Sequence, residues 1–262
     1  MELFSVAGKH VLVTGGSRGI GLMIARGFVE AGAHVIISSR KADVCHSVAA
    51  DLTAAGKASG GTCAAIPADL STVDGANGLA AAVTEAVPAL HVLVNNAGAT
   101  WGAPLEEFPD SAFDKLWAVN VKGIFRLTVS LLPALRAAAT VDDPARVITV
   151  GSIDGIRVPT MENYAYSASK AAVHMLTRHL AHVLAQEHIT VNAIAPGPFE
   201  SKMMAFALSD PEIRASIEQH VPLGRIGHPD DMAGAAIYLS SRAGGYLTGA
   251  VIPVDGGLST HG

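Results

Sequence analysis

Short, almost wholly apolar runs rich in β-branched residues recur along this chain, and alanine-rich stretches of helical character separate most of them. The runs do not alternate apolar with polar residues, which is typical of parallel strands covered on both faces. Strand, helix and strand repeated in this order, with right-handed crossovers, predict a doubly wound α/β sheet. The expected strands are His10–Thr14, His34–Ser39, Cys63–Pro67, His91–Asn95, Arg146–Gly151, Ile189–Ile194 and Val251–Val254.

Length and composition fit one domain built on such a sheet. The chain has 262 residues, of which 50% are hydrophobic and 16% charged, and its mean hydropathy is +0.37. These values exclude a disordered chain. With the seven apolar runs, they predict a single domain over residues 1–262, with seven mainly parallel strands and helices on both faces. The stretch 197–227 has no strand signal and includes the apolar segment Met203–Leu208, so we expect a substrate lid there.

Charge and cysteine usage exclude several other classes of protein. The net charge is −5 and the basic residues are scattered, so we expect neither a nucleic-acid partner nor membrane insertion. Cys45 and Cys63 form no C-x-x-C pair, and none of the 11 histidines belongs to an H-E-x-x-H motif, so no metal site is predicted. The start, MELFSVAGKHVLV, has no basic segment followed by a continuous apolar run. We therefore expect a cytoplasmic protein.

A glycine-rich turn follows the first expected strand directly and leads into an apolar helix. Glycines permit a tight turn and a close approach of the backbone to a pyrophosphate, and a helix N-terminus supplies free N–H groups. A turn in this position predicts dinucleotide binding on a Rossmann fold. The residues expected to take part are Gly15, Ser17, Arg18, Gly19, Ile20 and Gly21.

The end of the second expected strand indicates which dinucleotide is bound. A site that prefers NAD usually has an acid there to accept from the ribose hydroxyls, but the first acid after this strand is Asp43. Arg40 stands in the place of the acid, and its planar guanidinium suits the 2′-phosphate of NADP(H), which Arg18 could approach from the other side.

A tyrosine and a lysine four residues apart, Tyr166 and Lys170, carry the chemistry that such a cofactor would require. This spacing puts both side chains on one face of a helix. The Lys170 ammonium is expected to lower the pKa of the Tyr166 phenol toward working pH, so that Tyr166 serves as general acid in reduction and general base in oxidation. The neighbouring Tyr164 has Ala168 at the corresponding position and lacks a lysine partner.

The ordered set of motifs resembles the compact, single-domain branch of the short-chain dehydrogenases/reductases from about residue 8 to Gly257. It comprises the glycine loop, Asn95-Asn96-Ala97-Gly98, Asn120, Ser152, Tyr166-x-x-x-Lys170 and Pro196-Gly197. The resemblance implies a catalytic set of Asn120, Ser152, Tyr166 and Lys170. Ser152 would hold the substrate oxygen, Asn120 would hold a water that relays protons, and Lys170 would also bind the nicotinamide ribose.

The resemblance also implies further cofactor contacts and self-association. The segment Thr248–Gly257 is similar to the last strand of the family, which is usually buried between subunits, so we expect a homotetramer or homodimer. The cofactor-binding residues that the resemblance adds to the glycine loop and Arg40 are Asp69, Leu70, Asn96, Ala97, Gly98, Tyr166, Lys170, Pro196, Gly197 and Ser201.

The expected substrate pocket is largely apolar. Its candidate lining is Trp101, Leu105, Ile153, Val158 and the Met203–Leu208 segment. The segments Asn95–Pro109 and Ile194–Met203 are most similar to NADPH-dependent 3-oxoacyl reductases of the rhamnolipid-pathway type, which implies reduction of a 3-oxoacyl thioester or another hydrophobic ketone. The alternatives are a sugar, polyol or steroid-type alcohol dehydrogenase and, more remotely, a non-catalytic nucleotide-sensing Rossmann protein.

Overall fold

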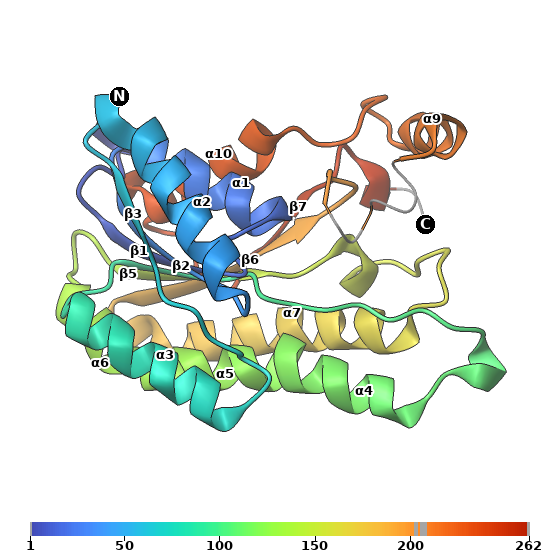
Figure 1. Ribbon diagram of the computed structural model, residues 1–262, viewed down its shortest axis with the longest axis horizontal. Coiled ribbons are helices and arrows are strands. Elements are labelled where there is room, and N and C mark those ends of the chain that lie inside the picture. The colour runs from blue at the N-terminus through green and yellow to red at the C-terminus, as the bar shows by residue number, and fades with distance from the viewer. Residues whose placement is uncertain (1, 202–203, 205–208, 261–262) are drawn as a thin grey trace.

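The structure is a computed structural model that describes residues 2–201, 204 and 209–260. Most of the expected apolar lid segment, Met203–Leu208, lies outside the described residues. Within them, seven parallel strands form one sheet in the order β3-β2-β1-β4-β5-β6-β7 (Figure 1). The strands are β1 (His10–Thr14), β2 (His34–Ser38), β3 (Thr62–Ala65), β4 (Val92–Asn95), β5 (Ala145–Val150), β6 (Ile189–Pro196) and β7 (Val251–Val254). The predicted doubly wound α/β fold is confirmed.

The central strands are buried along nearly their whole length, which explains why their sequences are continuously apolar. Their register brings the carboxyl ends to one edge of the sheet. Thr14 pairs with Ser38 across β1 and β2, and Asn95 pairs with Thr149 across β4 and β5. Polar residues that follow the strands therefore gather along this edge, although they lie far apart in the sequence.

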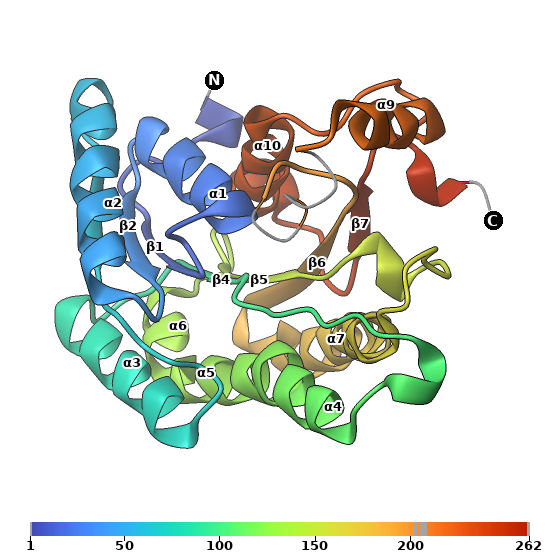
Figure 2. The same cartoon turned by 45° about the vertical axis from the view of Figure 1, so that its right-hand side comes forward.

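Helices cover both faces of the sheet (Figures 1 and 2). One layer contains α1 (Gly19–Glu30), α2 (Ala42–Ala55) and α10 (Pro229–Ser240), and its apolar core includes Ile24, Phe28 and Met232. The other layer contains α3 (Val73–Ala86), α4 (Asp110–Trp117), α5 (Ile124–Ser130), α6 (Leu132–Ala138) and α7 (Tyr164–Leu184). Its core includes Leu79 and Leu127. The α7 helix crosses this face beneath β5 and β6 and carries the tyrosine–lysine pair.

A π-helical turn, η4 (Ala118–Gly123), joins α4 to α5 and carries Asn120. Turns of this kind occur often at functional sites, because the wider turn redirects one side chain out of the helical pattern. A Cβ at Gly123 would lie 2.5 Å from the Leu70 carbonyl oxygen, so the turn packs directly against the segment that follows β3.

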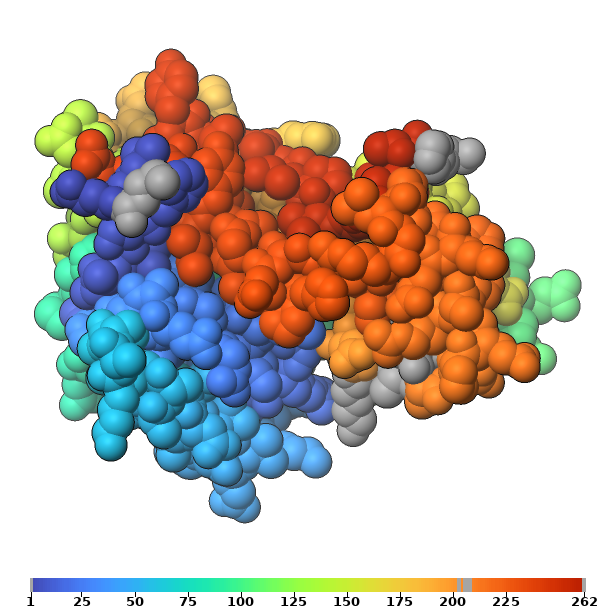
Figure 3. All heavy atoms as spheres, turned by 90° about the horizontal axis from the view of Figure 1, so that it is seen from above, coloured from blue at the N-terminus to red at the C-terminus, as the bar shows by residue number. Residues whose placement is uncertain are grey.

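The expected lid region contains α9 (Pro211–His220), which follows residues that the structure does not describe. Figure 3 shows the segment around α9 projecting from the body of the molecule, and none of its residues is buried. Its base is joined by a bridge between Phe199 and Gly227. Among the described residues, no single helix has the length and hydropathy of a membrane span. Two consecutive helical segments, Asp110–Ser130 and Leu132–Ala138, meet those criteria only when they are taken together, and the chain bends between them.

Candidate active site

The candidate site lies at the carboxyl edge of the sheet, where the strand order reverses. The chain builds outward from β1 through β2 to β3, and then returns to place β4 on the other side of β1. The connections on the two sides therefore leave in opposite directions, and ligands of sheets with this topology bind at that point. The glycine turn after β1, the Asn95–Gly98 segment after β4 and the Ser152 turn after β5 all meet this edge (Figure 2).

Tyr166 and Lys170 occupy the first turns of α7 and are both buried. The Lys170 Nζ atom lies 5.5 Å from the centroid of the Tyr166 ring and donates a hydrogen bond of 2.8 Å to the Val150 carbonyl oxygen, at the end of β5. The predicted pairing of these two side chains on one helix face is therefore present, and the lysine also attaches α7 to the sheet.

The pKa of Tyr166 shifts in the direction opposite to the sequence-based expectation. Burial raises the pKa of Tyr166 to about 12, although the Ser152 side chain opposes that change. Burial also lowers the pKa of Lys170 to about 8, and the carboxylate of Asp154 counteracts the decrease. The expectation was wrong because it considered only the attraction between ammonium and phenolate, whereas loss of hydration acts more strongly on both groups.

Ser152 follows β5 and is buried beside the tyrosine. Its Oγ atom accepts a 3.1 Å hydrogen bond from the Asp154 backbone N–H and so starts the short helix η5 (Ile153–Gly155). Ser152 is therefore a turn-capping serine as well as a neighbour of Tyr166. The cap fixes its side-chain oxygen in position, and the hydroxyl proton stays free to be donated.

Asn120 is fully buried, and its side-chain amide joins three segments. Its Oδ1 atom accepts from the Ala99 N–H at 2.9 Å, and its Nδ2 atom donates to the Ala99 carbonyl at 3.0 Å and to Ser169 Oγ at 2.9 Å. These bonds tie the π-helical turn to the loop after β4 and to α7. Gly98 packs against the same group, since a Cβ there would lie 3.2 Å from Asn120 Oδ1 and 3.7 Å from Lys170 Nζ.

The glycine turn has a backbone suited to an anion. Gly15 and Gly19 have φ values of +65° and +53°, which favour glycine. Gly19 begins α1, and the preceding Arg18 provides no side-chain cap, so the first N–H groups of the helix receive no side-chain hydrogen bond from their cap residue. Ser201 closes on this turn, because a Cβ at Gly19 would lie 3.2 Å from the Ser201 Cβ.

The end of β2 offers further donors for a nucleotide. The hydroxyl oxygens of Ser38 and Ser39 are buried and have no hydrogen-bond partner among the described residues. Arg40 is exposed next to them, and its charge contributes to lowering the pKa of Asp69, which follows β3. Unpartnered hydroxyls beside an exposed guanidinium fit a ribose phosphate, which accepts hydrogen bonds from both kinds of group.

The Asn95–Gly98 segment forms most of its hydrogen bonds with the end of β1 and the glycine turn. Asn96 Nδ2 donates to the backbone oxygens of Thr14 and Gly15, at 2.8 Å and 3.2 Å. The Thr14 hydroxyl in turn accepts from the N–H groups of Asn96 and Ala97, at 2.9 Å and 3.0 Å. Asn96 thus stabilises the backbone of the glycine turn through hydrogen bonds. Among the other expected contacts, Leu70 and Pro196 are buried, and a Cβ at Gly197 would lie 2.8 Å from the Asp255 Cα.

Two residues of this site were missed by sequence reasoning, Thr14 and Asp154. Thr14 is the last residue of β1, and a polar residue at the end of an apolar run was the available signal. Asp154 lies two residues after Ser152 in a segment that we treated as substrate loop. Of the expected pocket lining, Trp101, Leu105 and Val158 are exposed, whereas Ile153 is buried.

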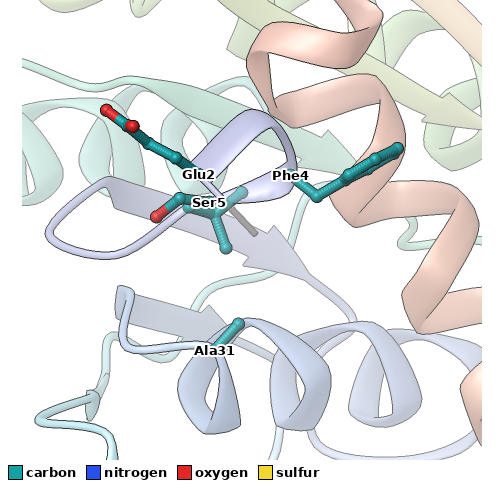
Figure 4. A pocket seen from close by; sticks show the side chains of 5 residues that line it. Glu2, Phe4, Ser5 and Ala31 are labelled. Atoms are coloured by element: carbon teal, nitrogen blue, oxygen red, sulfur yellow. The ribbon is translucent and has the colours of Figure 1, made fainter.

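Other features of the described residues contribute nothing to this site. No group of three or more His, Cys, Asp or Glu side chains among them could hold a metal ion. A separate hollow lies at the opposite end of α1, and only two of its lining residues have polar side chains (Figure 4). Its lining consists of Glu2, Phe4, Ser5, Val6 and Ala31.

Comparison with known proteins places this arrangement in a family. A family model described as "Enoyl-(Acyl carrier protein) reductase", of the short-chain dehydrogenase type, matches residues 15–259. The chain belongs to the short-chain dehydrogenases/reductases. The resemblance predicted from its motifs is confirmed, and so is the prediction of an oxidoreductase.

Known relatives match this short-chain dehydrogenase/reductase over nearly its full length. The rhamnolipid biosynthesis 3-oxoacyl-(acyl-carrier-protein) reductase of Pseudomonas aeruginosa is 50% identical over 255 residues, which cover 97% of this chain and 98% of that protein. Galactitol 2-dehydrogenase (L-tagatose-forming) of Cereibacter sphaeroides is 36% identical, covering 98% and 97%. A solved structure, the Pseudomonas aeruginosa RhlG/NADP active-site complex, superposes with a TM-score of 0.95 at 49% identity and covers 99% of each chain.

Proposed function

We propose that this protein transfers a hydride between NADP(H) and a carbonyl or secondary alcohol, and that it reduces a 3-oxoacyl thioester or another hydrophobic ketone. The observation that carries the proposal is the buried arrangement of Tyr166, Lys170 and Ser152 at the carboxyl edge of the sheet, opposite the glycine turn. A proton donor and an oxygen-binding hydroxyl there are the groups that carbonyl reduction requires from a protein.

Each residue of the set has a distinct role in this proposal. Tyr166 donates its phenolic proton to the substrate oxygen in reduction and takes one back in oxidation. Ser152 holds that oxygen through its hydroxyl, and Lys170 supplies positive charge beside the phenol. Asn120 holds the water that relays protons, and the bonds of its side-chain amide to Ala99 and Ser169 keep the surrounding segments in place. When bound, NADPH supplies the hydride.

NADP(H) is favoured over NAD(H) by the charges at the end of β2. Arg40 offers a guanidinium, and the unpartnered hydroxyls of Ser38 and Ser39 lie beside it. An acid that would accept from the ribose hydroxyls of NAD is missing from this position, since the first acid after β2 is Asp43. The solved relative with TM-score 0.95 is an NADP complex, which supports the same preference.

The substrate class rests on the apolar approach to the site and on the relatives. Trp101, Leu105 and Val158 are large apolar residues that remain exposed in this structure. A 3-oxoacyl chain could cover them, because burial of apolar surface is favourable. The relative with 50% identity is named for the reduction of such a chain on acyl carrier protein. The second candidate is polyol oxidation, which the name of the galactitol 2-dehydrogenase relative favours.

Substrate comparison tests these candidates. Purified protein is assayed for NADPH oxidation with acetoacetyl-CoA and with a bulky aryl ketone, and for NADP⁺ reduction with galactitol. We expect turnover of acetoacetyl-CoA and at most slow reaction with galactitol. Fast galactitol oxidation without reaction on either ketone would contradict the proposed substrate class and support the second candidate.

We further infer that the protein self-associates as a homotetramer or homodimer in the cytoplasm. Large apolar side chains are exposed on adjoining helices of one face, namely Phe113 and Trp117 on α4 and Phe125 and Val129 on α5. Exposed apolar groups gathered in this way favour association with a second copy. The two free thiols, Cys45 and Cys63, are compatible with a reducing compartment.

A further inference from the structure

Asp154 is a carboxyl group beside the active site that the roles proposed above do not use. It lies on η5, two residues after Ser152, and is half-buried. Its backbone N–H donates to Ser152 Oγ at 3.1 Å, and its Oδ2 atom accepts from Asn163 Nδ2 at 3.1 Å. The Asn163 carbonyl accepts in turn from the Tyr166 N–H at 2.8 Å. Asp154 is thereby fixed to the serine turn through its backbone and to the start of α7 through its carboxyl.

Gly155 seats the backbone of η5 on α7 at the level of the lysine. A Cβ on Gly155 would lie 2.7 Å from the Lys170 carbonyl carbon and 2.7 Å from the Ala171 nitrogen. The backbone of η5 therefore rests directly on α7 at the level of Lys170, with no side chain between them. Asp154, the preceding residue, is held at this contact.

Among the described residues, Arg157 on its own segment and Tyr166 and Lys170 on α7 are the charged and titratable groups that interact with Asp154. The His174 ring on α7 lies against the neighbouring Gly155. The strand β6 also packs against η5, but its residues Ile189–Pro196 include no ionisable side chain. Burial lowers the pKa of His174 to about 4, so this ring is neutral at ordinary pH.

The carboxylate interacts with both members of the tyrosine–lysine pair. It raises the pKa of Lys170, against the larger effect of burial, and it raises the pKa of Tyr166. Both effects have the sign that a negative charge must have, since it favours the ammonium over the amine and the phenol over the phenolate. Burial also raises the pKa of the Asp154 carboxyl, and the charges of Arg157 and Lys170 partly oppose that increase.

We propose that Asp154 is a positioning residue whose negative charge, held at the serine turn, keeps Lys170 an ammonium and Tyr166 a neutral phenol. The inference rests on the roles proposed above for Tyr166 and Lys170. Asp154 acts through these two residues and through the Ser152 turn, without itself exchanging a proton with the substrate. Its carboxylate therefore extends the pH range over which the site can protonate a ketone.

The pH profile of an isosteric variant tests this role. Asp154→Asn can keep the hydrogen bond from Asn163 and loses only the charge. We measure kcat/KM for NADPH-driven reduction between pH 6 and 10, with acetoacetyl-CoA or the aryl ketone. The alkaline limb of the profile is expected to move down by about one pH unit, because the lysine and the tyrosine both lose protons more readily. In the oxidative direction the activity should rise at a correspondingly lower pH.

Two further variants separate charge from structure. Asp154→Glu retains the charge and should keep the alkaline limb close to its wild-type position. Asp51→Asn removes the same charge from the exposed surface of α2, on the other face of the sheet, and should leave the profile unchanged. If Asp154→Asn does not fold, Asn163→Ala is measured instead. This variant removes the hydrogen-bond partner of the Asp154 carboxylate, and it should shift the alkaline limb in the same direction as Asp154→Asn but by a smaller amount.

An alkaline limb of Asp154→Asn that coincides with the wild-type limb would overturn the proposal. If neither ketone reacts, the proposed substrate class has failed, and the role of Asp154 is then judged by tyrosinate absorbance near 295 nm. The difference between Asp154→Asn and Asp154→Asn/Tyr166→Phe isolates the phenol of Tyr166. For the wild type, the difference from Tyr166→Phe isolates the same phenol. The Tyr166 phenol should ionise at lower pH in Asp154→Asn than in the wild type, and ionisation at the same pH would overturn the proposal.

Discussion

Arg40 is the residue that we propose selects between the two dinucleotides. It is exposed at the end of β2, next to the unpartnered hydroxyls of Ser38 and Ser39. Hydrogen bonds to a charged group contribute about 1.5–3 kcal/mol, enough to decide between cofactors that differ in one phosphate. The same guanidinium also contributes to lowering the pKa of Asp69, after the larger effect of the hydrogen bonds from Ser71.

Arg40→Asp is expected to shift the preference from NADPH toward NADH. The ratio of kcat/KM values for the two cofactors should fall by roughly 10- to 100-fold, because a favourable charged contact is lost and a repulsive one is gained. Steady-state kinetics with each cofactor measures this ratio. Arg26→Gln, on the exposed side of α1, serves as control, and an unchanged ratio in Arg40→Asp would rule out the assigned role of Arg40.

At the scale of single residues, the sequence predicted which side chains form the site more readily than it predicted the burial and contacts of those side chains. The spacing of Tyr166 and Lys170 correctly placed both on one helix face. The direction of the Tyr166 pKa shift was wrong, because burial of the ring results from packing that no local pattern reports. Asp154 was missed for a similar reason, since its hydrogen bond to Asn163 joins residues on two elements.

Close contact between η5 and α7 sets the geometry of the site at the level of elements. Gly151 and Gly155 both lie against the His174 ring, and a Cβ on Gly155 would also meet the α7 backbone. The serine turn therefore docks on the helix that carries Tyr166 through two residues without side chains. This contact fixes the position of Ser152 relative to the phenol.

Gly155→Ala is expected to lower both stability and activity. The added methyl group must displace η5 from α7, which costs about 1–3 kcal/mol in the free energy of unfolding. Urea denaturation and kcat measure the two effects. Gly78→Ala, at a position of α3 where a Cβ would meet nothing within 4 Å, should instead be neutral or slightly stabilising. Equal stability of the two variants would contradict the proposed docking contact.

Elements were predictable wherever a continuous apolar run is fully buried. β5 and β6 are examples, and their boundaries agree with the expected runs to within two residues. β3 is shorter than expected, because its alternating half-buried residues end at Ala65. The π-helical turn around Asn120 was not predicted, and its close contact between Gly123 and Leu70 joins residues far apart in the sequence.

The whole molecule brings together segments that are far apart in the sequence. The turns after β1, β4 and β5 reach one edge because all strand pairs among the described residues are parallel. This consequence of topology made the location of the site predictable from strand order alone. The lid remains a prediction, because it depends on contacts of residues 202–208, most of which the structure does not describe.

The central claim is that the buried phenol of Tyr166 exchanges the proton during hydride transfer. The most direct measurement compares Tyr166→Phe with Tyr164→Phe, which removes a phenol only two residues away that faces Glu162 at 3.4 Å. We predict that Tyr166→Phe binds NADPH normally, by fluorescence titration, and loses about 10²- to 10⁴-fold in kcat, whereas Tyr164→Phe remains active. A Tyr166→Phe variant that turns over ketone at a rate close to wild type would contradict the claim.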